Sequence, residues 1–100
     1  MTTILFQGDS LTDACRDKSA ECKDPNRLLG VGYVNHLAQV LMSENPDIRV
    51  LNHGVNGNRI MDLYARWIED TLNIDFQVLS ILIGVNDVGF ALRMNKGADA

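Results

Sequence analysis

The sequence lacks the features that mark membrane, secreted and nucleic-acid-binding proteins. Its nine lysines and arginines are not collected in any one stretch, and thirteen aspartates and glutamates bring the formal net charge to -4. We therefore expect neither nucleic acid nor a membrane as a partner. The longest apolar run, residues 78–83, is far too short to cross a bilayer. The N-terminal segment has neither the basic region nor the apolar region of a signal peptide, so a cytoplasmic protein is expected.

Cysteine is also scarce. The two cysteines, Cys15 and Cys22, lie in one polar stretch at a spacing that matches no metal-binding motif. Two thiols do not make a disulfide framework, and in a cytoplasmic protein they are expected to be reduced and incidental. A local disulfide that closes a surface loop is the alternative.

Length and composition are those of one globular domain at most. Of 100 residues, 46% are hydrophobic and 22% charged, which argues against disorder. Three short apolar segments, residues 3–6, 48–51 and 78–83, each run into a turn that contains glycine, as strands do. The third segment is almost continuously apolar and β-branched, which is typical of a strand buried on both faces of a parallel sheet.

Two helices are predicted between these strands. From Tyr33 the apolar side chains follow the spacing of an amphipathic helix that Asn45-Pro46 ends; they are Val34, Leu37, Ala38, Leu41 and Met42. A second helix is expected over residues 60–72, with a buried side formed by Leu63, Trp67, Ile68 and Leu72. Residues 13–30 are polar and are predicted to form a long loop. Alternation of strands and helices gives an α/β fold with a parallel sheet and right-handed crossovers.

This topology brings three turns to one edge of the sheet. The strands end at Gly8-Asp9-Ser10, at Asn52-His53-Gly54 and at Gly84-Val85-Asn86-Asp87. In open α/β sheets the ligand crevice lies at the carboxyl ends of the strands. This edge is therefore the candidate site.

Small polar residues in these turns suit acyl transfer. Ser10 follows the first strand directly, which exposes its hydroxyl as a nucleophile, while Gly54 and Asn86 supply N–H donors for an oxyanion. Each residue alone is explained by a structural role, as a turn former, a helix cap or part of an Asx turn. It is their occurrence at three successive strand ends that favours an acyl-transfer site. The G-x-S-x-G elbow of the α/β-hydrolase fold is absent.

The three turns resemble the sequence blocks of the GDSL esterases, also called SGNH hydrolases. The matching segments are Gly8-Asp9-Ser10-Leu11-Thr12-Asp13, Gly54-Val55-Asn56-Gly57-Asn58-Arg59 and Gly84-Val85-Asn86-Asp87. The resemblance implies a flavodoxin-like three-layer α/β/α fold and a serine esterase without metal or organic cofactor. In that site Ser10 is the nucleophile and first oxyanion donor, Gly54 the second donor and Asn86 the side-chain donor. The first block and the segment Leu51-Asn52-His53-Gly54 also resemble the bacterial branch of the family that includes carbohydrate acetylesterase-like members.

The family's fourth block, Asp-x-x-His, is missing from the sequence. The two histidines are His36, expected to be a partly exposed helix residue, and His53, beside the second turn. His53 does not stand at the position of the family's base, so a structural or substrate-lining role is expected. It would serve as a substitute base only if its imidazole reached hydrogen-bonding distance of the Ser10 hydroxyl.

The predicted sheet is also incomplete, because the family has five parallel strands and this chain supplies three. With the family's order, 2-1-3, residues 78–83 would form an edge strand that invites association. Residues 1–100 are therefore expected to be the N-terminal part of a single domain, with the catalytic His and Asp beyond residue 100. A two-chain or swapped assembly and a self-sufficient minimal domain are the alternatives.

Three functions follow from these observations. The leading hypothesis is an esterase for small acyl esters, with acetyl esters of carbohydrates as one candidate class. The second is a catalytically silent binding or assembly module that self-associates through its third strand. The third is a receiver-like phosphoacceptor domain, since Asp9 and Asp87 stand at strand ends, although no adjacent acidic pair follows the first strand. Asp9 and Asp13 would repel a phosphate, which disfavours nucleotide or FMN binding; Asp9 and Asp87 are expected to hold their turns.

Overall fold

The sheet has three parallel strands in the predicted order. The computed structural model of the chain describes residues 1–99, with side chains described for residues 1–93. Strand β1 (Thr2–Gly8) lies in the centre between β2 (Ile48–Asn52) and β3 (Val78–Leu82). Thr2 pairs with Ile48, and Ile4 pairs with Val78, so the carboxyl ends of the strands share one edge. The predicted parallel sheet is confirmed.

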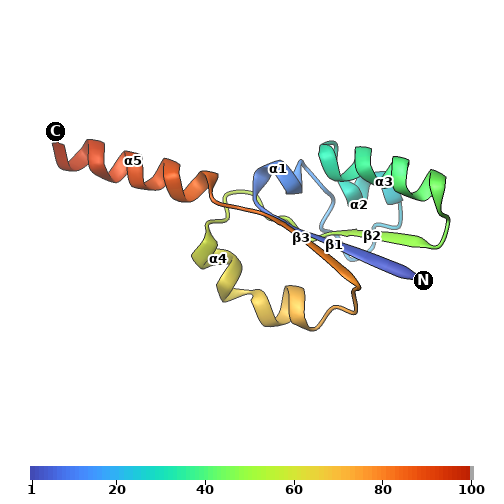
Figure 1. The fold of residues 1–100 in the computed structure, drawn as a ribbon. Helices are drawn as coiled ribbons and strands as arrows, with labels where there is room; N and C mark the ends of the chain where they lie inside the picture. Colours follow the sequence, from blue (N-terminus) through green and yellow to red (C-terminus); the bar gives the residue numbers. More distant parts are fainter. Residues whose placement is uncertain (100) are drawn as a thin grey trace.

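Helices cover both faces of this sheet. Figure 1 shows α1 (Ser10–Asp13), α2 (Pro25–Leu29) and α3 (Tyr33–Glu44) on one face, and α4 (Ile60–Ala65) and η1 (Ile68–Leu72) on the other. The last helix, α5 (Val85–Asp99), leads away from the sheet (Figure 1). The three-layer α/β/α arrangement is therefore confirmed. Within residues 1–99, no helix is long and apolar enough to span a membrane.

The main core lies between the sheet and α3. Phe6 and Val34 are buried together with Leu29 and Ala38, and the rings of Phe6 and Tyr33 meet edge to face with centroids 5.9 Å apart. The helix predicted from Tyr33 is confirmed, and Asn45 caps its end by donating its N–H to the Leu41 carbonyl at 3.0 Å. Leu37, predicted to be buried, is 40% exposed instead.

The segment predicted as a long loop contains a short helix, α2. Its N-cap is Asp24, whose carboxylate accepts a hydrogen bond from the Asn26 N–H at 3.0 Å, and Pro25 occupies the first helical position. Pro25 fits there because its missing N–H would have no helical partner anyway. Only Leu28 and Leu29 are apolar in this helix, too few to reveal a helical period.

The predicted helix over residues 60–72 is interrupted. It consists of α4 and the π-helical η1, with Arg66 and Trp67 between them. A π-helical turn holds more residues than an α-helical turn, so the apolar period shifts along the chain. Leu63 in α4 is buried as predicted, but in η1 the buried residue is Thr71, whereas Ile68 and Leu72, predicted to be buried, are 65% and 59% exposed.

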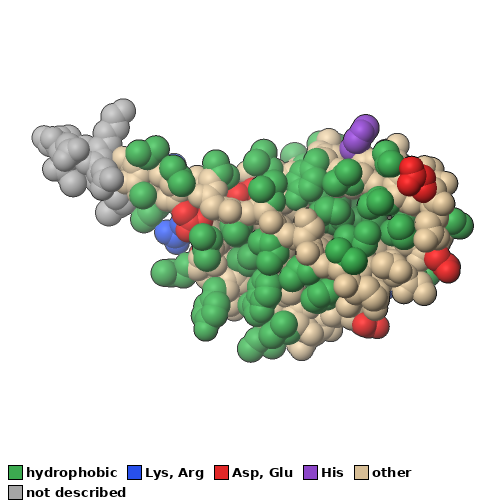
Figure 2. Space-filling model, in the orientation of Figure 1, with side chains coloured by type: hydrophobic (Ala, Val, Ile, Leu, Met, Phe, Trp, Pro, Cys, Tyr) green, Lys and Arg blue, Asp and Glu red, His purple; other side chains and the backbone are tan. Residues whose placement is uncertain are grey.

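Strand β3 forms the edge of the sheet, as the strand order predicted, and is not buried on both faces. Val78, Ile81 and Leu82 are each nearly half exposed. Figure 2 shows hydrophobic side chains gathered over the region that α4, η1 and β3 occupy in Figure 1. Cys15 is exposed and Cys22 half-buried, and the two thiols are not joined in a disulfide.

Candidate active site

Ser10 is the first residue of α1 and follows the end of β1 directly. The preceding Asp9 is buried and caps the helix: its carboxylate accepts from the Leu11 N–H at 3.1 Å and its carbonyl accepts from the Asp13 N–H at 2.8 Å. The expectation that Asp9 holds its turn is confirmed. Ser10 itself is half-buried, and its amide has no acceptor within the described part of the chain. A first-turn helix N–H of this kind is available to a ligand.

Gly54 is buried against the helix that carries Ser10. A Cβ atom at Gly54 would lie 2.5 Å from the Asp13 nitrogen and 2.8 Å from the Thr12 Cβ. Its φ is not in the left-handed region, so glycine is required here by close packing. The Gly54 N–H donates to the Asn52 Oδ1 at 2.9 Å. In this structure the predicted oxyanion donor already has an acceptor.

Side-chain and backbone hydrogen bonds join the second turn to the first. The buried Asn52 amide donates to the carbonyls of Thr12 at 2.7 Å and Leu29 at 2.8 Å. The Val55 N–H donates to the Gly8 carbonyl at 3.0 Å, and the Arg16 Nε donates to the Gly54 carbonyl at 2.7 Å. Residues 8–16 and 52–56 therefore form one connected unit.

Asp13, within the segment predicted as loop, is a buried part of this unit. One carboxylate oxygen accepts from the Asn56 N–H and from the Lys18 ammonium, both at 2.7 Å, and the other accepts from the Arg16 N–H at 3.2 Å. Burial raises the pKa of the Asp13 carboxyl, but these hydrogen bonds and the Lys18 charge outweigh burial and hold the pKa below its ordinary value. The carboxylate is thus kept ionised.

The third turn contacts the segment between the second turn and α4 through two side chains. The Asn86 amide, on the first turn of α5, donates to the Asn58 carbonyl at 3.0 Å. The Asp87 carboxylate accepts from the Ile60 N–H at 3.0 and 3.2 Å, so it caps α4 rather than holding its own turn as predicted. Gly84 enters this turn at φ +131°, a conformation that favours glycine.

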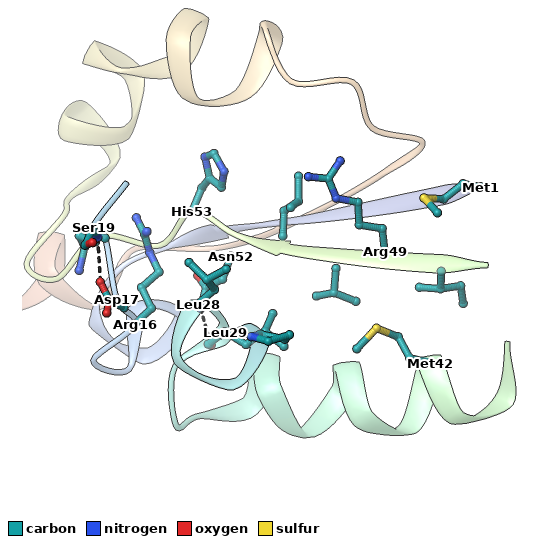
Figure 3. A pocket seen from close by; sticks show the side chains of 15 residues that line it. Met1, Arg16, Asp17, Ser19, Leu28, Leu29, Met42, Arg49, Asn52 and His53 are labelled. Atoms are coloured by element: carbon teal, nitrogen blue, oxygen red, sulfur yellow. Dashed lines mark hydrogen bonds between the residues drawn. The ribbon is translucent and has the colours of Figure 1, made fainter. Parts of the chain in front are cut away.

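His53 directly follows the last residue of β2. Figure 3 shows the imidazole on one side of β2 and the Asn52 amide on the other, at the end of a pocket of about 510 Å³ that follows this strand. Burial lowers the pKa of His53, Asp70 opposes this effect, and the charges of Arg16 and Arg66 lower it further. Among the described residues, no hydrogen bond joins His53 to the Ser10 hydroxyl. His36 is exposed on α3.

Sequence reasoning missed three polar side chains that hold the site together, Asn52, Gln7 and Arg66. Gln7 is fully buried, its amide donating to Thr71 Oγ1 at 3.0 Å and its carbonyl accepting from Arg66 at 2.9 Å. The sequence signal for Gln7 is its position as a polar side chain at the end of an apolar strand. Arg66 precedes Asp70 by four positions, and from the sequence this spacing indicates only an ion pair on a helix surface.

The fold and this edge define the class of the protein. A parallel sheet lies between two helical layers. The turns that carry Ser10, Gly54 and Asn86 lie at the carboxyl edge of this sheet. This is an α/β architecture with a site at the strand ends. The model of the GDSL-like lipase/acylhydrolase family matches residues 6–99. The chain therefore belongs to the GDSL-like lipase/acylhydrolase family.

Known proteins of this family are similar in sequence and fold. An acetylxylan esterase of Geobacillus stearothermophilus is 42% identical over 87 residues, which are 85% of this chain and 39% of that protein. A protein of Parabacteroides merdae described as a GDSL-like lipase superposes with a TM-score of 0.86 at 38% identity, covering 94% of this chain and 44% of its own. The structure of the acetylxylan esterase Axe2 of G. stearothermophilus superposes with a TM-score of 0.78 at 40% identity, covering 88% and 41%. The chain thus spans about two fifths of the length of these relatives.

Proposed function

We propose that the protein is a serine esterase that hydrolyses small acyl esters, with Ser10 as its nucleophile. The observation that carries the proposal is the joining of the Ser10 helix to the Gly54 turn, through the Asn52 amide on the Thr12 carbonyl and the Val55 N–H on the Gly8 carbonyl. Family membership supports the reaction class. Acyl transfer needs a nucleophile and N–H donors in a fixed mutual arrangement, which such a unit provides.

The proposed reaction has two steps. The Ser10 Oγ attacks the ester carbonyl carbon as its proton passes to a histidine, and the carbonyl oxygen becomes an oxyanion. Collapse of this intermediate expels the alcohol, which takes the proton from the histidine. Water then attacks the acyl-serine in the same way, which releases the carboxylic acid and restores Ser10.

Three donors are proposed for the oxyanion: the N–H of Ser10, the N–H of Gly54 and the Asn86 amide. The carboxamide of Asn86 has two hydrogens, so one remains when the other is donated to the Asn58 carbonyl. The Gly54 N–H is donated to Asn52 Oδ1, and an oxyanion would share or replace this acceptor. A charged acceptor forms the stronger hydrogen bond, which favours the exchange as negative charge develops.

The base and its acidic partner are proposed to come from outside residues 1–100. The sequence contains no Asp-x-x-His, and His53 has no hydrogen bond to Ser10 in the part of the chain described. Three structures of Axe2 variants are described as catalytic mutants, in which a serine, an aspartate or a histidine is replaced by alanine. The replaced aspartate and histidine of Axe2 stand three positions apart, which is the spacing absent here.

Acetyl esters of carbohydrates are the proposed substrate class within small acyl esters. The support is the similarity to an acetylxylan esterase over 85% of this chain. Substrate would bind at the carboxyl edge of the sheet, beside Ser10. No metal and no organic cofactor take part in the proposed reaction, because the serine and the histidine perform both proton and acyl transfer.

The experiment is hydrolysis of an activated acetyl ester by the full-length gene product and by its Ser10→Ala variant. We expect turnover by the wild type and none above the uncatalysed rate by the variant, because the variant lacks the attacking oxygen. Acetylated xylooligosaccharides then test the substrate class against long-chain acyl esters. Equal rates for wild type and Ser10→Ala would refute the esterase proposal.

A second candidate function is a silent assembly module that pairs through β3. The observation in its favour is the edge position of β3 with Val78, Ile81 and Leu82 each nearly half exposed. Such a module would turn over no ester with or without Ser10. The Ser10→Ala comparison therefore separates the two functions.

A further inference from the structure

Arg66 makes an unusual set of hydrogen bonds for a residue on a helix surface. It lies between α4 and η1, with 17% of its side chain exposed. Its Nε donates to Asn58 Oδ1 at 2.7 Å, and its Nη2 donates to the Gly8 carbonyl at 3.3 Å. Its Nη1 contacts three acceptors: Gln7 Oε1 at 2.9 Å, Asp70 Oδ2 at 3.0 Å and the His53 carbonyl at 3.1 Å.

Two of these acceptors, the Gly8 and His53 carbonyls, belong to turns of the candidate active site. The Gly8 carbonyl lies two residues before Ser10, and the His53 carbonyl belongs to the peptide bond whose N–H is that of Gly54. Asn58 connects the third turn, because its carbonyl accepts from the Asn86 amide while its side chain accepts from Arg66. One guanidinium thus contacts the first two turns directly and the third through one residue.

The surrounding helix fixes the guanidinium in place. Asp70 pairs with Arg66 from the next turn, and the Asp70 carbonyl accepts from the Gln7 amide at 2.7 Å. Gln7 also bonds to the buried Thr71, so η1 is fastened to the end of β1. Local π-helical turns are frequent at functional sites, and this one begins two residues after Arg66. A planar fork with five donors matches such a spread of acceptors, which a lysine ammonium cannot do.

We propose that Arg66 is a positioning residue for the esterase reaction, an inference that rests on the proposed function. It does not touch the substrate. It fixes the peptide bond that carries the Gly54 N–H, the backbone ahead of Ser10, and the Asn58 carbonyl to which the Asn86 amide is bonded. Loss of the guanidinium leaves every donor present but less well aligned with the developing oxyanion.

The test compares steady-state kinetics of the full-length gene product with its Arg66→Gln and Arg66→Lys variants on the same acetyl ester. We expect kcat to fall by roughly 10 to 100-fold in Arg66→Gln with KM changed less than threefold, since misplacement of about 1 Å can cost that much. Arg66→Lys can restore the ion pair with Asp70 and is expected to recover thermal stability without recovering kcat. A wild-type kcat in either variant would overturn the proposal.

Met42→Ala is the matched control for loss of stability. It removes apolar packing between α3 and the core cluster but no hydrogen bond of Arg66 or of the three turns. We expect a lower Tm with kcat unchanged; a loss of kcat equal to that of Arg66→Gln would overturn the positioning role. Ser10→Ala separates the two proposals. If activity requires Ser10 but not Arg66, the esterase proposal stands and only the positioning role of Arg66 is refuted.

Discussion

At the scale of single residues, the candidate site depends on small side chains in places where larger ones do not fit. Gly54 packs on the backbone of α1, and Asn52 fits beneath it with its three polar contacts satisfied. A buried amide with all its hydrogen bonds made specifies one arrangement of its neighbours. These two residues therefore allow the close approach between the Ser10 helix and the second turn.

Asn86→Ala tests the side-chain oxyanion donor. We expect kcat of the full-length gene product to fall on the order of 10² to 10³, because one donor to the developing charge is lost. Asn73→Ala, which replaces an exposed asparagine at the end of η1, serves as the control and should leave kcat unchanged. An unchanged kcat in Asn86→Ala would remove Asn86 from the oxyanion hole.

Gly54→Ala tests the close packing of the second turn on α1. The added methyl group would lie too near Thr12 and Asp13, and we expect a loss of about 1 to 3 kcal/mol in the free energy of unfolding in urea. Gly89→Ala is the control, since a Cβ there has nothing within 4 Å and lies in a helix, where alanine is favoured. Equal stability of Gly54→Ala and the wild type would contradict the packing described for Gly54.

At the scale of elements, the sequence correctly predicted the strands and helices that short-range patterns determine. The strands follow from apolar runs that end in glycine turns, and α3 follows from its apolar period and Asn45-Pro46. The interruption between α4 and η1 was not predictable in this way, because it depends on bonds from Arg66 to Gln7, 59 positions earlier. Topology located the three turns at one edge, but no spacing encodes the contact of Asn52 with Thr12, 40 positions away.

Asp13→Asn tests how α1 is held to the second turn. The pKa of Asp13 is lowered in the folded state, so ionisation stabilises the fold above the unfolded pKa of about 3.9, and this gain is lost as pH falls through the lower folded value. We expect the variant to be less stable by about 1 to 3 kcal/mol at pH 7. In urea titrations over pH 2 to 7, the difference between the two proteins should shrink below about pH 4. A difference that is constant with pH would contradict the ionised state of Asp13.

At the scale of the whole molecule, β3 and the helices beside it leave a large apolar surface uncovered. The exposed side chains there include Tyr64, Ile68, Leu72, Val78, Ile81 and Leu82. An edge strand with apolar side chains is a template for pairing with another strand. The relatives are more than twice as long as the part that this chain matches.

The 100-residue chain produced by itself is therefore expected to self-associate through β3. Sedimentation over a series of concentrations should give species larger than a monomer for the wild type. Ile81→Lys places a charge on the exposed part of β3 and should shift the equilibrium towards monomer. A wild-type chain that stays monomeric throughout the series would show that β3 does not pair.

The nucleophile is tested most directly by covalent labelling of the full-length gene product with a fluorophosphonate. Attack of the activated Ser10 Oγ on phosphorus expels fluoride and leaves a stable phosphonate ester. After trypsin digestion, we predict one modified peptide, which contains Ser10 and ends at Arg16, with fragment masses that place the adduct on Ser10, and no adduct in Ser10→Ala. An adduct on another residue, or equal labelling of wild type and Ser10→Ala, would contradict the assignment of Ser10 as the nucleophile.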